Sequence, residues 1–462
     1  MRKKSLLGIR LAGGLEEEIT PWAGISPLVE LGRRSGVMGV AKRVLPAKRS
    51  RKALGEDQMV ESFVLLSALG GECLEDMEHL KQDKGLPFIL GYTPPAPETA
   101  RQWLDRFHKE ELVAGQPRQG SFLPPESSRL LGLKEVNRQV IWSYVKEMPP
   151  RREVTFDVDA QLVETSKANA MYCYEGYKAY QPIEVSWAET GLVMADEFRD
   201  GNVPASSGIK RLVDEAYEML PPGPWQVKVR SDSAAYEQEN LDHWHNKGWK
   251  FAVSADMSLQ LRQEVEALPP AAWKMWQTEK GGKIREWAEV SYVPSRRYED
   301  RGAVPYRYVA IRVRCQQGDL FDPSFGRTAR ARYYAIVTNI WDMDGQALLE
   351  WQRGKAGTIE HIHHILTNEL AAGVYPSAKY GANAAWLRLQ VITHNLLQLF
   401  KALALPPEYA TARPKRLRFA VFTHFGRVVR HAGQLLMRLA GRAWRGVIGQ
   451  AEQRVLALSP PD

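Results

Sequence analysis

Acidic residues at three widely separated places in this 462-residue chain are of the type that binds divalent metal ions. Asp157 and Asp159 lie in FDVDAQ, Asp232 in VRSDS and Glu360 in TIEHIHH. Carboxylate oxygens are the hard ligands that Mg²⁺ prefers. Two such ions, about 4 Å apart, can serve both ends of a phosphodiester displacement. The acids therefore predict two-metal chemistry on a phosphate, provided that the fold brings them together.

Each acid taken alone has a simpler interpretation. Asp157 and Asp159 fall on the same face of a predicted strand, so one of them could be only a supporting or solvated residue. Asp232 could cap the helix that follows it, and Glu360 could be a solvated helix residue. Only the whole set, in the right order on the right elements, is specific.

The elements that must position these acids follow from the hydrophobic pattern of residues 151–255. EVTFDVDAQLVE alternates between apolar and polar side chains, as a half-buried strand does. Two more strand-like segments, a helix, the strand WQVKVRSDSA, a second helix and the strand WKFAVSAD come next. This order predicts an α/β, RNase H-like core with a mixed five-stranded sheet. In that core the middle of the first strand, the end of the fourth and a later helix carry the acids.

Residues 256–345 interrupt the core. EWAEVSYVP, YRYVAIRVRCQQG and RYYAIVTNIWD each read as strands, which predicts a mostly β insertion. Trp273, Trp276 and Trp287 in this segment fit core aromatics best, and stacking on a flipped base is the alternative. Residues 346–405 complete the core, and the nearly all-apolar GANAAWLRLQVITHNLLQLFKALAL predicts a buried helix.

The two ends of the chain are basic. Residues 1–55 predict a loosely ordered basic arm, either a solvated tail or a phosphate contact. Residues 56–150 predict a helical DNA-binding domain and a linker, because several short helices with basic flanks permit a helix-turn-helix reader. Residues 406–462 predict an Arg-rich helical region.

Composition limits the partners and the compartment. The net charge of +8 favours a polyanionic partner. Three cysteines without paired spacing argue against both a disulfide framework and a zinc site, and they fit a reducing cytoplasm. No apolar run reaches the roughly 18 residues that span a bilayer, so no membrane association is expected.

Two other kinds of site are not indicated. His361, His363 and His364 lie close together, but they lack the spacing of a zinc protease, so we expect His363 to flank the site or contact DNA. No GxxxxGK[ST] loop is present, and no nucleotide cofactor is expected.

Several segments together resemble the bacterial insertion-sequence DDE transposases, specifically the insertion-sequence family thirteen-eighty. The similar segments are FDVDAQLVE, YEGYKAYQP, EFRDGNVPA, VRSDSAAY, KAGTIEHIHHILTNELAAGVYPSAKYGANAAW and ITHNLLQLFK. GGECLEDMEHLKQD and TARQWLDRF also look like the family's DNA-binding region. The resemblance covers most of the chain.

The resemblance implies an RNase H-like transposase with a β insertion between its second and third acids. It assigns Asp159, Asp232 and Glu360 as catalytic ligands of two Mg²⁺ ions, for which Mn²⁺ would substitute, and it keeps Asp157 as the alternative first acid. Gln161 departs from the family's usual Thr. Thr367 stands where related enzymes often have Lys, and Lys355 is expected to supply that charge instead.

The expected activity is cut-and-paste transposition by a nucleoid-associated bacterial homodimer, with hairpin ends as a candidate route. Its partners would be the terminal inverted repeats and target DNA. DNA contacts are expected from Lys355, His363, Arg230, Arg416 and Arg427. Two alternatives stay open: another RNase H-like nuclease, such as a resolvase, and a transposase-derived DNA-binding protein without catalysis.

Overall fold

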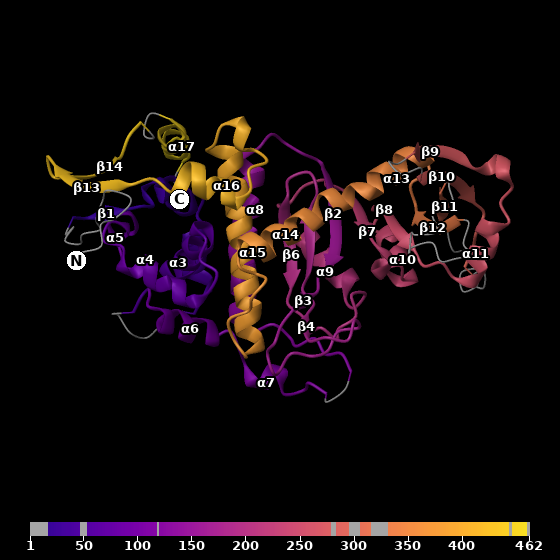
Figure 1. Cartoon of the computed structure of the whole chain (residues 1–462), viewed down its shortest axis with the longest axis horizontal. Coiled ribbons are helices and arrows are strands. Elements are labelled where there is room, and N and C mark those ends of the chain that lie inside the picture. The colour runs from indigo at the N-terminus through magenta and orange to yellow at the C-terminus, as the bar shows by residue number, and fades with distance from the viewer. Residues whose placement is uncertain are drawn as a thin grey trace, which may run out of the picture.

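The protein is described here by a computed structural model. It describes residues 17–46, 53–117, 120–278, 283–294, 305–315, 331–442 and 446–459. Residues 1–16 and 47–52, which hold much of the predicted basic arm, lie outside the described residues. The molecule is elongated, with a β-hairpin at one end of its long axis and the β-rich insertion at the other (Figure 1).

A mixed sheet forms the middle of the molecule. Its first five strands run in the order β6 (Leu192–Glu197), β5 (Ile183–Trp187), β2 (Glu153–Ala160), β7 (Gln226–Ser231) and β8 (Lys250–Ala255). β2 pairs antiparallel with β5 and parallel with β7, and β7 pairs parallel with β8. In chain order this is third, second, first, fourth, fifth. The RNase H-like core is therefore confirmed.

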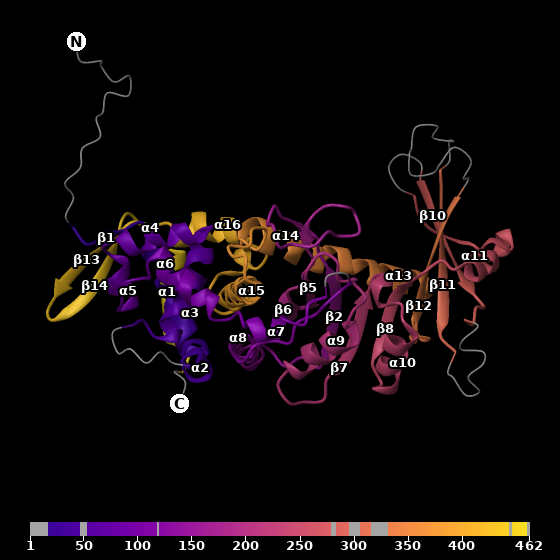
Figure 2. The same cartoon turned by 90° about the horizontal axis from the view of Figure 1, so that it is seen from below.

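The insertion extends the same sheet instead of forming a second one. β12 (Ala331–Thr338) pairs antiparallel with β8, and β11 (Arg307–Cys315), β10 (Lys283–Val290) and β9 (Lys274–Thr278) follow outward. The short helix α11 (Leu259–Glu266) lies beside these strands (Figure 2). The β character of the insertion is confirmed. Backbone hydrogen bonds between neighbouring strands join the core and the insertion into one nine-stranded sheet.

Helices cover both faces of the core sheet. α9 (Ile209–Glu218) packs against β2, β5 and β6, and α10 (Gln238–Asn246) packs against β8. On the opposite face lie α13 (Gly345–Arg353) and α14 (Ile359–Glu369) (Figure 2). The alternation of β2 separates the faces, because apolar side chains turn toward α9 and the aspartates toward α14.

The long helix α15 (Tyr380–Leu403) is the centre of the hydrophobic core, and nearly all of its residues are buried. Two polar side chains tie it to the edge strand β6. Arg388 binds the carboxylate of Asp196, with Nε 3.1 Å from Oδ2, and Asn395 hydrogen-bonds both backbone groups of Val193. The prediction of a buried core helix is confirmed.

The N-terminal helices pack on the other side of α15. They are α1 (Ser26–Arg34), α2 (Val37–Val44), α3 (Glu56–Leu69), α4 (Met77–Gln82), α5 (Leu86–Leu90), α6 (Pro97–Asp105), α7 (Glu110–Val113) and α8 (Ser128–Glu147). Leu31, Phe63 and Trp386 belong to the same buried cluster as the sheet residue Phe156. The prediction of a loosely ordered arm is thus wrong for its described part. Residues 26–44 form two helices, because their apolar side chains pack into this core.

The C-terminal region differs from its prediction. Beside the short α16 (Pro414–Leu417) and the helix α17 (Val447–Leu456), it forms a hairpin of β13 (Gly426–His431) and β14 (Gln434–Leu439). β13 also pairs with β1 (Ile19–Thr20). The helical expectation for residues 426–439 was wrong because it followed the spacing of the arginines, whereas the chain turns back at Ala432 and Gly433, both at positive φ.

Two observations bear on the compartment. Cys73 and Cys173 are free thiols. Within the described ranges, no helix combines the length and the apolar character needed to cross a bilayer.

Candidate active site

Asp159 and Asp232 lie at the same edge of the sheet. β2 and β7 are parallel neighbours in which Val158 pairs with Ser231. Asp159 follows Val158 in the chain, and Asp232 follows Ser231, so the two acids are neighbours at this edge. The side chain of Asp159 is half-buried and that of Asp232 is exposed. Asp232 also caps a short 3-10 turn, since its Oδ1 accepts a hydrogen bond of 3.1 Å from the backbone N–H of Ala234. The capping role considered from the sequence is therefore present.

The helix α14, which carries the third acid, is docked at this edge. The hydroxyl of Thr358 donates a hydrogen bond to Asp157. In the preceding 3-10 turn (Gly354–Gly357), the Nζ of Lys355 lies 3.3 Å from Oδ2 of Asp159. Glu360 stands exposed in the first turn of α14 and has no ion pair among the described residues. The structure thus brings the N-terminus of α14 to the strand that holds the first acid.

Asp157 is held by a buried arginine. Arg230 on β7 donates two hydrogen bonds to its carboxylate, from Nε to Oδ1 at 2.6 Å and from Nη2 to Oδ2 at 2.8 Å. Arg230 also donates to the backbone carbonyl of Trp351. A side chain at Gly354 would collide with Arg230, because its Cβ would lie 2.7 Å from Nη1. Arg230 is buried inside the fold and paired with Asp157, so in this structure it does not present its charge to the DNA contact predicted for it.

A second buried pair lies beside Asp159. Glu184 on β5 is the cross-strand partner of Asp159, and its Oε2 lies 3.0 Å from Nε2 of His363 on α14. Burial lowers the pKa of His363, but the carboxylates of Glu184 and Asp159 together outweigh burial and raise that pKa above its ordinary value. His363 therefore links α14 to the sheet and is not exposed for the DNA contact predicted for it.

Glu184 was missed by the sequence reasoning, although a signal was present. The segment IEVSW is otherwise strand-like and apolar, and a carboxylate within such a strand is unusual unless it has a partner. Its partner follows 179 residues later in the chain, and one sequence does not show that pairing.

The described residues contain no group of three or more His, Cys, Asp or Glu side chains that could hold a metal ion. The donor set nevertheless fits a divalent cation in its chemistry: Asp159, Asp232 and Glu360 offer carboxylate oxygens that solvent can reach. Asp157 and Glu184 do not, because both are buried against basic side chains.

The three candidate tryptophans of the insertion differ in exposure. Trp287 is 4% exposed, and the ammonium of Lys274 lies 4.6 Å from the centre of its ring. Trp273 is 9% exposed, and the guanidinium of Arg312 lies 4.2 Å from its ring. Both are packed in the sheet. Trp276 is only half-buried and lines an open groove with Gln277, Glu350, Arg353 and Gly354, next to the turn that holds Lys355.

The remaining predicted DNA contacts are also distinguished by burial. Lys355 is buried beside Asp159. Arg416 is exposed, and Arg427 is exposed with its Nη2 3.3 Å from a carboxylate oxygen of Glu17. Only the last two present a charge on the outer surface.

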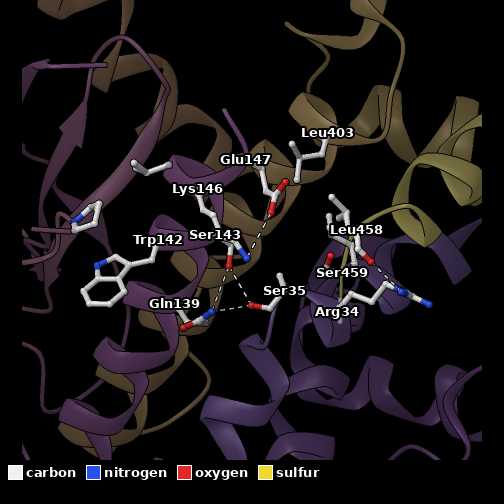
Figure 3. A pocket seen from close by; sticks show the side chains of 13 residues that line it. Arg34, Ser35, Gln139, Trp142, Ser143, Lys146, Glu147, Leu403, Leu458 and Ser459 are labelled. Carbon is white, nitrogen blue, oxygen red and sulfur yellow. Dashed lines mark hydrogen bonds and ion pairs between the residues drawn. The ribbon is translucent and has the colours of Figure 1, made fainter. Parts of the chain in front are cut away.

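A cavity of about 330 Å³ lies elsewhere, between α1, α8, α15 and the end of α17 (Figure 3). Its polar groups are largely paired. Gln139 and Ser143 both donate to the carbonyl of Ser35, and Arg34 donates to that of Leu458. Glu147 is its one acidic residue. This cavity has no set of groups for the chemistry predicted above.

A family of known proteins matches almost the whole chain. The family described as transposase DDE domain, group 1, matches residues 10–458, including all three proposed acids. The chain belongs to the DDE transposases. The resemblance seen in the sequence is thereby confirmed at the level of this enzyme family, whose members use divalent metal ions.

No curated protein matches this transposase. Among solved structures, it is similar to a cryo-EM structure of the piggyBac transposase synaptic complex with hairpin DNA, with a TM-score of 0.43 and 8% sequence identity. The match covers 81% of this chain and 75% of that chain.

Proposed function

We propose that this transposase binds the terminal inverted repeats of an insertion sequence and catalyses metal-dependent strand cleavage and strand transfer by a cut-and-paste route. The observation that carries the proposal is the meeting of β2, β7 and α14. Asp159 and Asp232 end adjacent parallel strands, and Lys355 and Thr358 dock the helix of Glu360 against the same strand.

Asp159, Asp232 and Glu360 would hold two Mg²⁺ ions, with Mn²⁺ able to substitute. When bound, these ions would activate the attacking oxygen and stabilise the leaving oxygen of the phosphodiester. Asp159 is the better first ligand than Asp157, because Arg230 and Thr358 already satisfy the buried carboxylate of Asp157. A metal bound to Asp159 would take over the position beside Lys355, whose charge would then be available to a DNA phosphate.

Strand cleavage and strand transfer would follow one another. Cleavage would free a 3′-hydroxyl, which would attack target DNA or the opposite strand to form a hairpin.

Trp276 is the tryptophan of the insertion that could stack on a displaced base, because its ring is partly exposed near the turn of Lys355. Two ends must be cut together, so a homodimer on DNA is part of the proposal.

Several finer assignments stay with this proposal. They are membership of family thirteen-eighty, recognition of the ends by the N-terminal helices and the basic C-terminal region, and a bacterial nucleoid-associated location.

The test is incubation of the purified chain with duplex DNA that carries the element's ends, with Mg²⁺, Mn²⁺ or EDTA, and separation of the products on a denaturing gel. Metal-dependent nicks at the ends, followed by joined products, would support the proposal. Cleavage without joining would favour a resolvase-like nuclease. Tight binding without any cleavage in either metal would favour a DNA-binding derivative.

A further inference from the structure

The C-terminal region that contains the hairpin carries an unusual concentration of positive charge. Between Glu408 and Glu452 the chain has no acidic residue, and it has nine basic ones: Arg413, Lys415, Arg416, Arg418, Arg427, Arg430, Arg438, Arg442 and Arg445. Two of these hold the fold, since Arg413 pairs with Glu369 and Arg418 donates to the carbonyls of Ser67 and Ala68. The arginines of the hairpin do not have such a role.

The charges on the hairpin and just after it are largely uncompensated. Arg430, Arg438 and Arg442 are exposed and have no ion-pair or hydrogen-bond partner in the described part of the chain. Arg427 has only the exposed Glu17, and such surface pairs contribute little. Arg427 and Arg438 are also direct cross-strand partners. Like charges placed opposite one another repel, and an anion between them would remove that cost.

The shape of the hairpin complements this charge. β1 pairs with only the first two residues of β13, so the rest is a two-stranded ribbon that stands out at one end of the molecule (Figures 1 and 2). Its tip, Ala432 and Gly433, has positive φ at both residues, the turn that matches the natural twist of a hairpin. Val428 is buried, so the alternating residues Arg427 and Val429 face outward.

We propose that the β13–β14 ribbon is a DNA-binding element that lies in the major groove of duplex DNA, with Arg427 and Arg438 on the phosphates. The major groove admits a two-stranded β ribbon, and arginine side chains supply the charge-assisted bonds that phosphate needs. This inference rests on the proposed function for its biological setting, because the duplex would be an end of the element. It assigns to a ribbon the contact that the sequence pattern placed on a helix.

The test measures binding without catalysis, in EDTA, by the fluorescence anisotropy of a labelled duplex of mixed sequence over a series of salt concentrations. R427Q/R438Q should lower the slope of log affinity against log salt by about 2 and weaken binding roughly tenfold, because two phosphate contacts are lost. R427K/R438K should keep the slope. The control R151Q/R152Q removes the same charge from exposed residues before β2, at the opposite edge of the sheet from Asp159, and should change neither value.

A second measurement covers the case in which the double variant folds poorly. A photoreactive group at Gln434, at the tip and on the face of Arg427 and Arg438, should crosslink to the duplex, and one at the exposed Gln226 should not. An unchanged salt slope would overturn the proposal. So would crosslinks from Gln434 to a second copy of the chain in place of DNA, since the ribbon would then be a subunit contact. If the wild type binds through the ribbon but never cleaves DNA, the proposed function fails and this inference stands.

Discussion

The acids around the candidate site fall into an inner and an outer group. The inner acids, Asp157 and Glu184, are almost fully buried, and each lies against a basic side chain at 2.6 to 3.0 Å. The outer acids, Asp232 and Glu360, are exposed and have no ion pair among the described residues. Asp159 lies between the groups, half-buried and beside Lys355.

This difference separates two uses of the same chemical group. A buried carboxylate with a fixed partner holds elements together, here β2 to β7 and β5 to α14. An exposed carboxylate contributes little to folding and is free to bind a cation. Removing one member of each group should therefore have opposite effects on activity and on stability.

The largest effect is expected for the outer acids. Asp232→Asn and Glu360→Gln should each lower cleavage of end-bearing duplex on the order of ten-thousandfold, because each removes a proposed metal ligand. Stability should change by less than about 0.5 kcal/mol, since both side chains are exposed. Gel-based cleavage rates and urea unfolding check the two statements. Glu218→Gln, an exposed acid on α9, is the matched control, and full activity in Glu360→Gln would contradict the assignment.

For the inner group, the effect should appear in folding. Asp157→Asn should lower the free energy of unfolding by about 3–5 kcal/mol, because it leaves the buried Arg230 without a counter-charge. Asp159→Asn should cost less than about 1 kcal/mol. Urea unfolding of both variants measures this. If Asp157→Asn is stable but inactive while Asp159→Asn still cleaves DNA, then Asp157 is the metal ligand and Asp159 is the supporting residue.

Asp200 is a third kind of acid in this molecule. It is buried like the inner acids, but it accepts its hydrogen bond from a neutral side chain and not from a basic one. It is 6% exposed and accepts a hydrogen bond of 3.1 Å from Gln116. Burial raises the pKa of Asp200 to about 6 from its ordinary 3.8. The folded state therefore takes up a proton more readily than the unfolded state, and this group destabilises folding increasingly as pH rises from 3.8 to 6.

Asp200→Asn should remove that penalty. We expect the variant to be about 3 kcal/mol more stable than the wild type at neutral pH, and equal to it near the ordinary pKa of the carboxyl. Urea unfolding at the two pH values measures the difference. A gain of the same size at both values would show that ionisation of Asp200 is not its cause.

The smallest effect is expected at the rim of the site. Trp276→Ala should slow cleavage of the ends by about tenfold, the loss of one stacking contact. Trp276→Phe should keep most of the rate, because a phenyl ring still stacks. Cleavage rates of the three proteins decide the matter, and equal rates would assign Trp276 to packing alone.

The sequence predicted those parts of the molecule whose pattern is local. The alternation of β2, the strands of the insertion and the apolar run of α15 were each sufficient to predict the element that the structure contains. The preference for Asp159 over Asp157 agrees with their surroundings, but it came from the family resemblance and stays a proposal.

The parts that the sequence did not predict depend on partners far away in the chain. Arg230 and His363 look like surface cations in the sequence, and only the fold places them against Asp157 and Glu184. Residues 26–44 look like a basic arm in the sequence, but in the structure their apolar side chains pack into the same core as α15. In the hairpin, arginine spacing imitated a helix, although Gly426 and Gly433 and the valines of β13 favour strands and a turn.

The position of α15 has a consequence for how this transposase can be divided. One side of the helix packs on the sheet and the other on the N-terminal helices, so cutting the chain near residue 150 would leave a wide apolar surface open on each fragment. Neither piece should stay soluble when expressed alone. N-terminal helices packed in this way cannot be exchanged between relatives as a separate unit, and changes in them must arise by substitution within an intact protein.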